Sequence, residues 1–153
     1  MVEHGLHDHV GYWLRRLSDE VHTSFERQIA GRGVTVAQWN VLVTVYYRQA
    51  TTTAAVAQFI GIDPGAVSRL VDRLADKGLM TRSPDPESRR RLQLSLTDAG
   101  RALVPDLIRI ADQNDEAFFG ALSPEERAAL LRLLKQLLPA DLNRQEASHA
   151  RTP

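Results

Sequence analysis

The sequence contains no cysteine, and this absence excludes several kinds of site at once. A chain without thiols forms no disulfide framework, no thiolate zinc site, no iron–sulfur cluster and no cysteine-based redox switch. The sequence also lacks the run of about 18 apolar residues that a membrane-spanning helix requires. Residues 1–8 are polar and rich in histidine, so we expect no secretory signal in them. These absences together predict a cytoplasmic protein with no membrane partner.

Neither sign of charge predominates, because 19 Lys and Arg residues balance 19 Asp and Glu residues. Zero net charge argues against a non-specific polyanion binder. The charge is unevenly distributed, however, since residues 66–91 hold seven basic and four acidic side chains. A basic middle segment on a neutral chain favours an anion-binding module. The 153 residues, 43% of them hydrophobic, have the size and composition of a single domain spanning residues 1–153.

Hydrophobic periodicity predicts helices in the first half of the chain. Apolar residues recur every three or four positions over residues 10–29, which is typical of an amphipathic helix that ends at residues 31–33. Thr35 and Gln38 form a capping box for a second helix reaching about residue 48. A threonine in residues 51–53 caps a short third helix, and Asp63 caps a fourth.

Strand-like sequence occurs in one place. Residues 79–83 and 92–96 flank a turn-rich segment, which predicts a hairpin whose tip carries Arg89, Arg90 and Arg91. Thr97 then caps a long helix, and Ser123 begins a leucine-rich final helix that ends before a polar tail at residues 141–153. The predicted fold class is therefore mostly α with a small β-hairpin wing (α+β).

Residues 52–97 follow the order short helix, tight turn, second helix, basic hairpin, which is the layout of a winged helix-turn-helix. Small residues at the start of the second helix allow close entry into a major groove, and arginines one turn later can bond to guanine. Each basic feature alone is typical of a solvated surface, and it is their combination over this short span that indicates DNA binding. The candidate DNA-binding residues are Thr52, Thr53, Pro64, Gly65, Ser68, Arg69, Asp72, Arg73, Arg82, Arg89, Arg90 and Arg91.

Several motifs over residues 7–140 resemble the MarR family of bacterial transcriptional regulators. The most specific of them is the wing arginines followed by Leu-Thr-x-x-Gly. The motifs are Val56-Ala57, Gly61-Ile62-Asp63, Val67-Ser68-Arg69-Leu70-Val71-Asp72-Arg73-Leu74, Lys77-Gly78-Leu79, Arg82, Arg89-Arg90 and Leu96-Thr97-Asp98-Ala99-Gly100. The family commonly has Asp-Arg-Arg in the wing. Here Ser88 stands in place of that aspartate, so an acid that would brace the wing arginine Arg90 is missing.

The resemblance implies a homodimer whose terminal helices intertwine, with residues 7–33 and 98–140 as the dimerisation region and residues 34–97 as the DNA-binding lobe. It also implies a repressor that binds a pseudo-palindromic operator and is released by a small aromatic or phenolic effector. The candidate effector pocket is formed by Tyr12, Trp13, Trp39 and Tyr46. The leucine stripe of the last helix agrees with a dimer, because it offers more apolar area than one small domain covers.

Other sites have weaker sequence support. His4, His7, His9 and His22 lack the closed ligand spacing of a metal site, so we expect neither a bound metal nor another cofactor. Ser18, Asp19 and His22 lie near one another without an oxyanion-hole turn, so we expect no enzyme activity. Two alternatives remain open. One is a protein-interaction or antirepressor module that keeps the fold without binding DNA, and the other is a metal-responsive regulator.

Overall fold

The structure, a computed structural model, describes residues 4–139. Within them it contains six α-helices, one two-stranded antiparallel sheet and a 3-10 turn at Leu6–Asp8. The elements are α1 Val10–Ala30, α2 Val36–Tyr46, α3 Thr53–Ile60, α4 Pro64–Asp76, β1 Met80–Asp85, β2 Ser88–Leu96, α5 Asp98–Phe119 and α6 Pro124–Leu137. The predicted fold class is confirmed, and the predicted tail at residues 141–153 lies outside the described residues.

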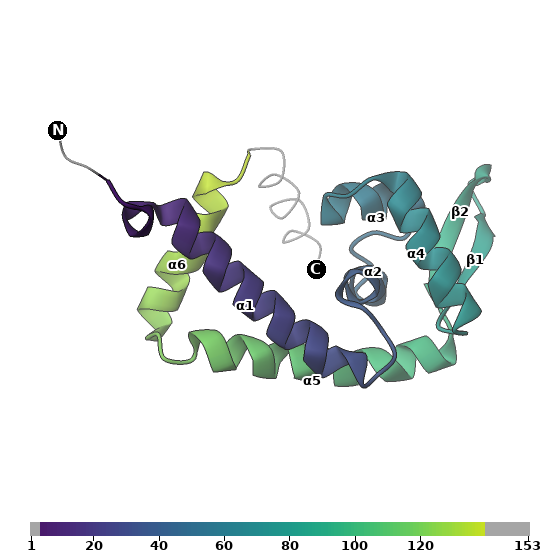
Figure 1. The fold of residues 1–153 in the computed structure, drawn as a ribbon. Coiled ribbons are helices and arrows are strands. Elements are labelled where there is room, and N and C mark those ends of the chain that lie inside the picture. The colour runs from purple at the N-terminus through teal and green to yellow at the C-terminus, as the bar shows by residue number, and fades with distance from the viewer. Residues whose placement is uncertain (1–3, 140–153) are drawn as a thin grey trace.

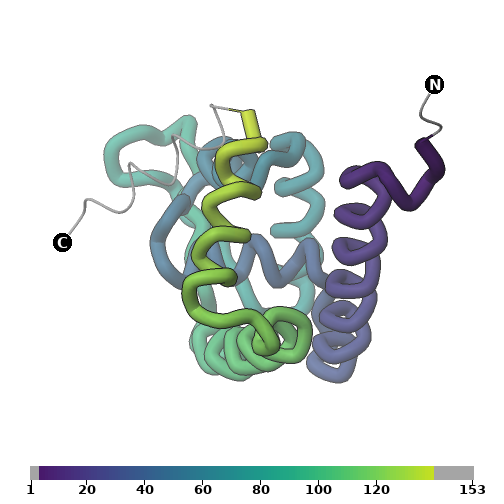
Figure 2. Tube along the Cα trace, turned by 90° about the vertical axis from the view of Figure 1, so that its left-hand side faces the viewer, coloured from purple at the N-terminus to yellow at the C-terminus, as the bar shows by residue number. Residues whose placement is uncertain are grey.

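The helices are arranged along α5, which runs the length of the molecule (Figure 1). Helix α1 packs against α5. Helix α6 follows at the far end of α5, while α2, α3, α4 and the sheet gather near its beginning (Figures 1 and 2). Among the described residues no helix is long and apolar enough to cross a membrane.

One apolar core joins the long helices to the lobe formed by α2, α3, α4 and the sheet. Phe25 and Ile29 of α1 are buried together with Leu42 of α2, Leu74 of α4 and Leu107 of α5. Because the same cluster holds residues from all these elements, the lobe is fixed to the long helices by shared burial as well as by the chain.

The predicted helix caps are confirmed. The Thr35 hydroxyl accepts from the Gln38 amide at 3.1 Å, and the Gln38 side chain accepts from the Thr35 amide at 3.2 Å. Ser123 begins α6 through an equivalent capping box. Thr97 caps α5, and the first turn of the helix requires glycine at position 100, because a Cβ atom on Gly100 would overlap the carbonyl oxygen of Leu79. The start of α5 therefore lies directly against the chain that enters β1.

The hairpin is longer than predicted. β1 pairs with β2 from Met80 opposite Leu96 to Pro84 opposite Leu92, and the register then shifts so that Asp85 lies opposite Ser88. Alternating hydrophobicity identifies the inner part of each strand, but the outer part is polar and gives no such signal.

The expected position of Arg89, Arg90 and Arg91 at the hairpin tip is wrong. The three arginines lie in β2, where the register shift leaves them without opposite residues on β1, and the turn itself lies between Asp85 and Ser88. The Asp85 carboxylate accepts from the Glu87 amide at 2.9 Å and closes this turn. The arginines are therefore carried on the side of the wing, as the extra residues of a bulge.

Candidate nucleic-acid interface

Helices α3 and α4 are joined by a tight turn with a fixed geometry. Gly61 ends α3 at a φ of +84°, a left-handed conformation that favours glycine. Asp63 then begins α4, where its carboxylate accepts from the Ala66 amide at 3.1 Å and Pro64 occupies the first turn. Pro64 and Gly65 are both exposed, so the beginning of α4 presents small side chains and the backbone N–H of Gly65 to the solvent.

The two faces of α4 separate its structural residues from its candidate contacts. Val67, Val71 and Leu74 are fully buried. Arg69 and Arg73 lie on the exposed face, one turn apart, and within the part of the chain that the structure describes neither has an ion-pair partner. The positive charge of both side chains is therefore available to an external anion.

Three of the predicted contacts are hydrogen-bonded to one another. Arg82 of β1 donates to the Asp72 carboxylate at 2.5 Å and to the Ser68 carbonyl oxygen at 3.0 Å. Asp72 and Ser68 both belong to α4, so this guanidinium fixes the wing to the helix. This contact braces the wing against α4, and direct DNA contact by Arg82 and Asp72 stays a prediction of the sequence pattern.

A concave surface brings four further predicted residues together. Thr52 and Thr53 at the start of α3 and Arg90 and Arg91 of β2 line one cavity of about 550 Å³. An isolated bridge between Thr52 and Gln93 holds the two segments side by side. Threonine hydroxyls, arginine guanidiniums and the first amides of a helix are all groups that contact phosphate.

Gln58 also lines this cavity but is absent from the predicted set. The sequence contains a signal for it, because Val56 and Ala57 form the buried side of α3 and leave Gln58 exposed. An exposed polar side chain in the same cavity as Thr52 is a candidate contact to the phosphate backbone of DNA.

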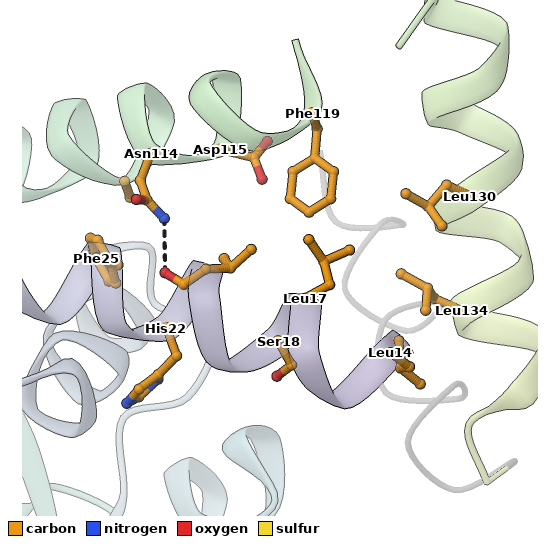
Figure 3. A pocket seen from close by; sticks show the side chains of 12 residues that line it. Leu14, Leu17, Ser18, His22, Phe25, Asn114, Asp115, Phe119, Leu130 and Leu134 are labelled. Atoms are coloured by element: carbon orange, nitrogen blue, oxygen red, sulfur yellow. Dashed lines mark hydrogen bonds between the residues drawn. The ribbon is translucent and has the colours of Figure 1, made fainter. Parts of the chain in front are cut away.

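A second concavity lies between α1, α5 and α6 and measures about 460 Å³. We call it the long-helix groove. Leu17 of α1, Phe119 of α5 and Leu130 and Leu134 of α6 point toward one another across it (Figure 3). Its buried polar group is Asn114, which donates to the Val21 carbonyl at 3.2 Å. The lining residues are Leu14, Leu17, Ser18, Val21, His22, Phe25, Ala111, Asn114, Asp115, Phe119, Leu130 and Leu134.

The four aromatic residues predicted for an effector pocket do not meet in one place. Tyr12 and Trp13 contact each other at the beginning of α1, where the Trp13 indole donates to the His7 carbonyl at 2.8 Å. Trp39 packs edge-on against Phe25, in the core. Tyr46 lines a separate polar cavity together with residues of β2. Helical spacing groups residues of one helix, and it carries no information on which helices face each other.

The histidines are also separated. His7 stacks near Tyr12 and Trp13, whereas His22 lines the long-helix groove. In residues 4–139 no three His, Asp or Glu side chains are placed so that they could hold a metal ion. The Asp19 carboxylate lies 3.7 Å from Arg15, with which it forms an exposed ion pair.

The chain is similar to proteins of one family of regulators. A family model described as MarR family matches residues 34–92, which include α2, α3, α4, β1 and all three wing arginines. The HTH-type transcriptional repressor NicR of Pseudomonas putida is 29% identical over 136 residues, covering 89% of this chain and 86% of NicR. The multiple antibiotic resistance protein MarR of Escherichia coli is 31% identical over 107 residues, covering 69% of this chain and 74% of MarR.

Solved structures show the same similarity. A structure of Bordetella bronchiseptica BpsR, whose DNA binding is regulated by 6-hydroxynicotinic acid, matches with a TM-score of 0.80 and 32% identity over 89% of this chain and 97% of that one. A variant of Escherichia coli MarR in complex with operator DNA matches with a TM-score of 0.78 and 25% identity, over 85% of this chain and 94% of that one.

Proposed function

Because the chain belongs to the MarR family of transcriptional regulators, we propose that it represses transcription by binding a pseudo-palindromic operator as a homodimer. Helix α4 enters the major groove, and the β1–β2 wing lies at the adjacent minor groove. The protein acts by binding DNA and not by catalysis. It does so in the cytoplasm, where the chromosome is accessible. The residues carried from sequence to this proposal are Thr52, Thr53, Pro64, Gly65, Ser68, Arg69, Arg73, Arg89, Arg90 and Arg91, with Gln58 added.

The observation that carries the proposal is the pairing pattern of the arginines. Arg82 is bound by α4, whereas Arg69 and Arg73 of α4 have no ion-pair partner among residues 4–139. The same holds for Arg90 and Arg91 of the wing. Arg82 thus joins the wing to α4, and the other four arginines leave their positive charge available on these two elements. A duplex presents phosphates and base edges to such a surface.

The exposed leucines support the dimer. Leu131, Leu134 and Leu137 of α6 and the cap residue Leu138 remain exposed, and within the described residues α6 buries no side chain. Val10, Leu14 and Leu17 are exposed along α1. A contiguous apolar surface of this kind is typical of an interface, and a second copy of the chain offers the same stripes by two-fold symmetry.

The test is selection of bound sequences from a random duplex library by the full chain, followed by mobility shifts on the selected DNA with and without zinc. We expect an inverted repeat whose half-sites lie about 10 base pairs apart, the spacing of two recognition helices on one face of the duplex. Enrichment of no sequence would favour the protein-interaction alternative. Binding that requires zinc would favour the metal-responsive one.

A second function, release by a small aromatic or phenolic effector, is supported by the long-helix groove. This groove combines mainly apolar walls with one buried polar side chain, Asn114, a lining typical of ligand sites. The DNA binding of BpsR is regulated by 6-hydroxynicotinic acid. That compound is therefore the first probe to titrate against the protein–DNA complex. Substitution of Phe119 by Ala in the groove should weaken the response more than substitution of the predicted Tyr46, which lies elsewhere.

A further inference from the structure

Lys77, the residue that ends α4, reaches across to the turn between α1 and α2. Its Nζ donates to the carbonyl oxygen of Gly33 at 2.6 Å and to Oε1 of Gln38 at 2.9 Å. Gly33 adopts a φ of +73°, a backbone conformation that glycine permits. Gln38 is only 3% exposed and belongs to the capping box of α2. Both acceptors are thus held in place independently of Lys77.

The same turn is bound to α5 on its other side. Arg32, the residue before Gly33, donates to the Asp106 carboxylate of α5. Arg109 donates to the same carboxylate at 2.6 Å and to Gln113 at 3.0 Å, so Asp106 is held on its own helix. Two consecutive polar links therefore connect the end of α4 to the middle of α5 through the α1–α2 turn.

The geometry indicates that the Lys77 side chain binds other residues of the protein and does not contact DNA. Its ammonium group has three donors, and two of them are used by Gly33 and Gln38. It lies eight residues beyond Arg69, about 12 Å farther along the helix axis at 1.5 Å per residue. Lys77 is therefore at the end of α4 opposite to the one that begins at Pro64, where the small exposed residues lie.

We propose that Lys77 is a positioning residue: it fixes the orientation of α4 relative to α5, and thereby the distance between the two recognition helices of a dimer. This inference rests on the proposed function, because the distance matters only when two copies bind one operator. Core packing of Val67, Val71 and Leu74 holds α4 against the rest of the lobe. The Lys77 links hold the far end of the helix, where a small rotation would displace Arg69 and Arg73 in both half-sites.

The first measurement needs neither DNA nor a dimer. Lys77→Met keeps most of the stem and removes the ammonium, while the control Arg15→Met removes one positive charge from an exposed site on α1. We expect faster amide hydrogen exchange in Lys77→Met over residues 31–35 and 74–79, with exchange of the central α5 amides unchanged. Unchanged exchange in both segments would overturn the proposal, whatever the chain binds.

The second measurement uses the DNA selected by the wild-type chain, which tests the proposed function before any variant is made. Lys77→Met should lose about 2- to 30-fold in affinity for the selected operator, the range of coupling changes seen for residues outside a binding site. It should lose less on operators whose half-sites are moved apart or together by one base pair. The dependence of affinity on salt should match that of the wild type.

Three results would contradict the positioning role of Lys77. Wild-type affinity of Lys77→Met on every spacing would show that the links do not position α4. An equal loss on all spacings with a salt slope lower by about one unit would make Lys77 a phosphate contact. A loss that follows the drop in unfolding midpoint, and is restored at lower temperature, would make its role purely structural. Arg15→Met should match the wild type in each comparison.

Discussion

The guanidinium of Arg82 lies 2.5 Å from the Asp72 carboxylate, and this contact joins the wing to the recognition helix. The pair is partly exposed, so its contribution to the free energy of unfolding is about 1 kcal/mol or less. Its consequence for function is larger, because the second hydrogen bond from Arg82 to the Ser68 carbonyl fixes β1 against the face of α4 that carries Arg69.

We therefore predict that Arg82→Ala weakens operator binding while barely changing the unfolding midpoint. The double variant Asp72→Ala with Arg82→Ala should bind little worse than Arg82→Ala, because each single change already breaks the same contact. A binding titration of the four proteins at one salt concentration measures this coupling. Additive losses from the two changes would instead make each residue an independent DNA contact.

Arg69 and Arg73 are predicted to behave differently from Arg82. Replacing either by Ala should weaken operator binding by about 1–3 kcal/mol, with the fold and the dimer unchanged, because both side chains lie off the buried stripe. The matched control is Leu74→Ala, on the buried face of the same helix. It should lower the free energy of unfolding by about 2–5 kcal/mol. Thermal melting and binding titrations on all three variants separate the two effects.

Much of the lobe can be predicted from sequence because its signals are local. The caps at Thr35 and Asp63 depend on neighbouring residues, and both are confirmed. The location of Arg90 beside Thr52, by contrast, depends on a register shift between strands. That shift involves a polar stretch with no alternation to fix it.

The packing partners of the long helices are also not predictable from the sequence. Apolar periodicity identifies the apolar face of α1 but not what packs against it. Trp39 and Tyr46 are therefore predicted to share a site with Tyr12, although they lie apart. The Lys77 link to Gly33 spans 44 residues of sequence and joins a helix end to a turn. A single sequence contains no pattern that pairs two such positions.

Leu134 of α6 lines the long-helix groove and belongs to the exposed leucine stripe, so it provides the test of the dimer. Leu134→Glu should dissociate the dimer, because burying an unpaired carboxylate in an apolar interface costs several kcal/mol. Sedimentation of the wild type should give about twice the 17.1 kDa mass of the chain. Arg132→Glu, on the same helix but outside this groove, is the control. A wild-type chain that sediments as a stable, folded monomer at micromolar concentration would contradict the paired half-site arrangement.

Asp106 gives a prediction about pH. The hydrogen bond from Arg32, followed by that from Arg109, lowers the pKa of the Asp106 carboxyl below its usual value. A carboxyl whose pKa is lower in the folded state stabilises the protein above the unfolded pKa, and this stabilisation is lost as the pH falls through the folded pKa. Wild type should therefore be more stable than Asp106→Asn at neutral pH, with the difference shrinking below about pH 4. Urea denaturation from pH 3 to pH 7 measures the difference, and a gap independent of pH would contradict the ionic role.

The structure changes what is expected of an aspartate at position 88. Ser88 lies opposite Asp85 across the wing, and Asp85 already accepts from the Glu87 amide to close the turn. A second carboxylate at position 88 would brace Arg90, but it would also face Asp85. Like charges directly opposite on paired strands are destabilising. Ser88→Asp alone should therefore weaken operator binding or leave it unchanged.

Neutralising Asp85 should reverse this result. Asp85→Asn keeps an oxygen acceptor for the Glu87 amide, so the turn is retained. In that background Ser88→Asp no longer faces a like charge, and the new carboxylate can orient Arg90 toward the minor groove. We expect the double variant to bind more tightly than Asp85→Asn, with the larger gain on A·T-rich flanks, where the narrow groove concentrates negative potential. Titrations of the four proteins on A·T- and G·C-flanked operators measure this. If Ser88→Asp weakens binding equally in both backgrounds, the added carboxylate acts by repelling phosphate, and the wing arginines contribute charge without orientation.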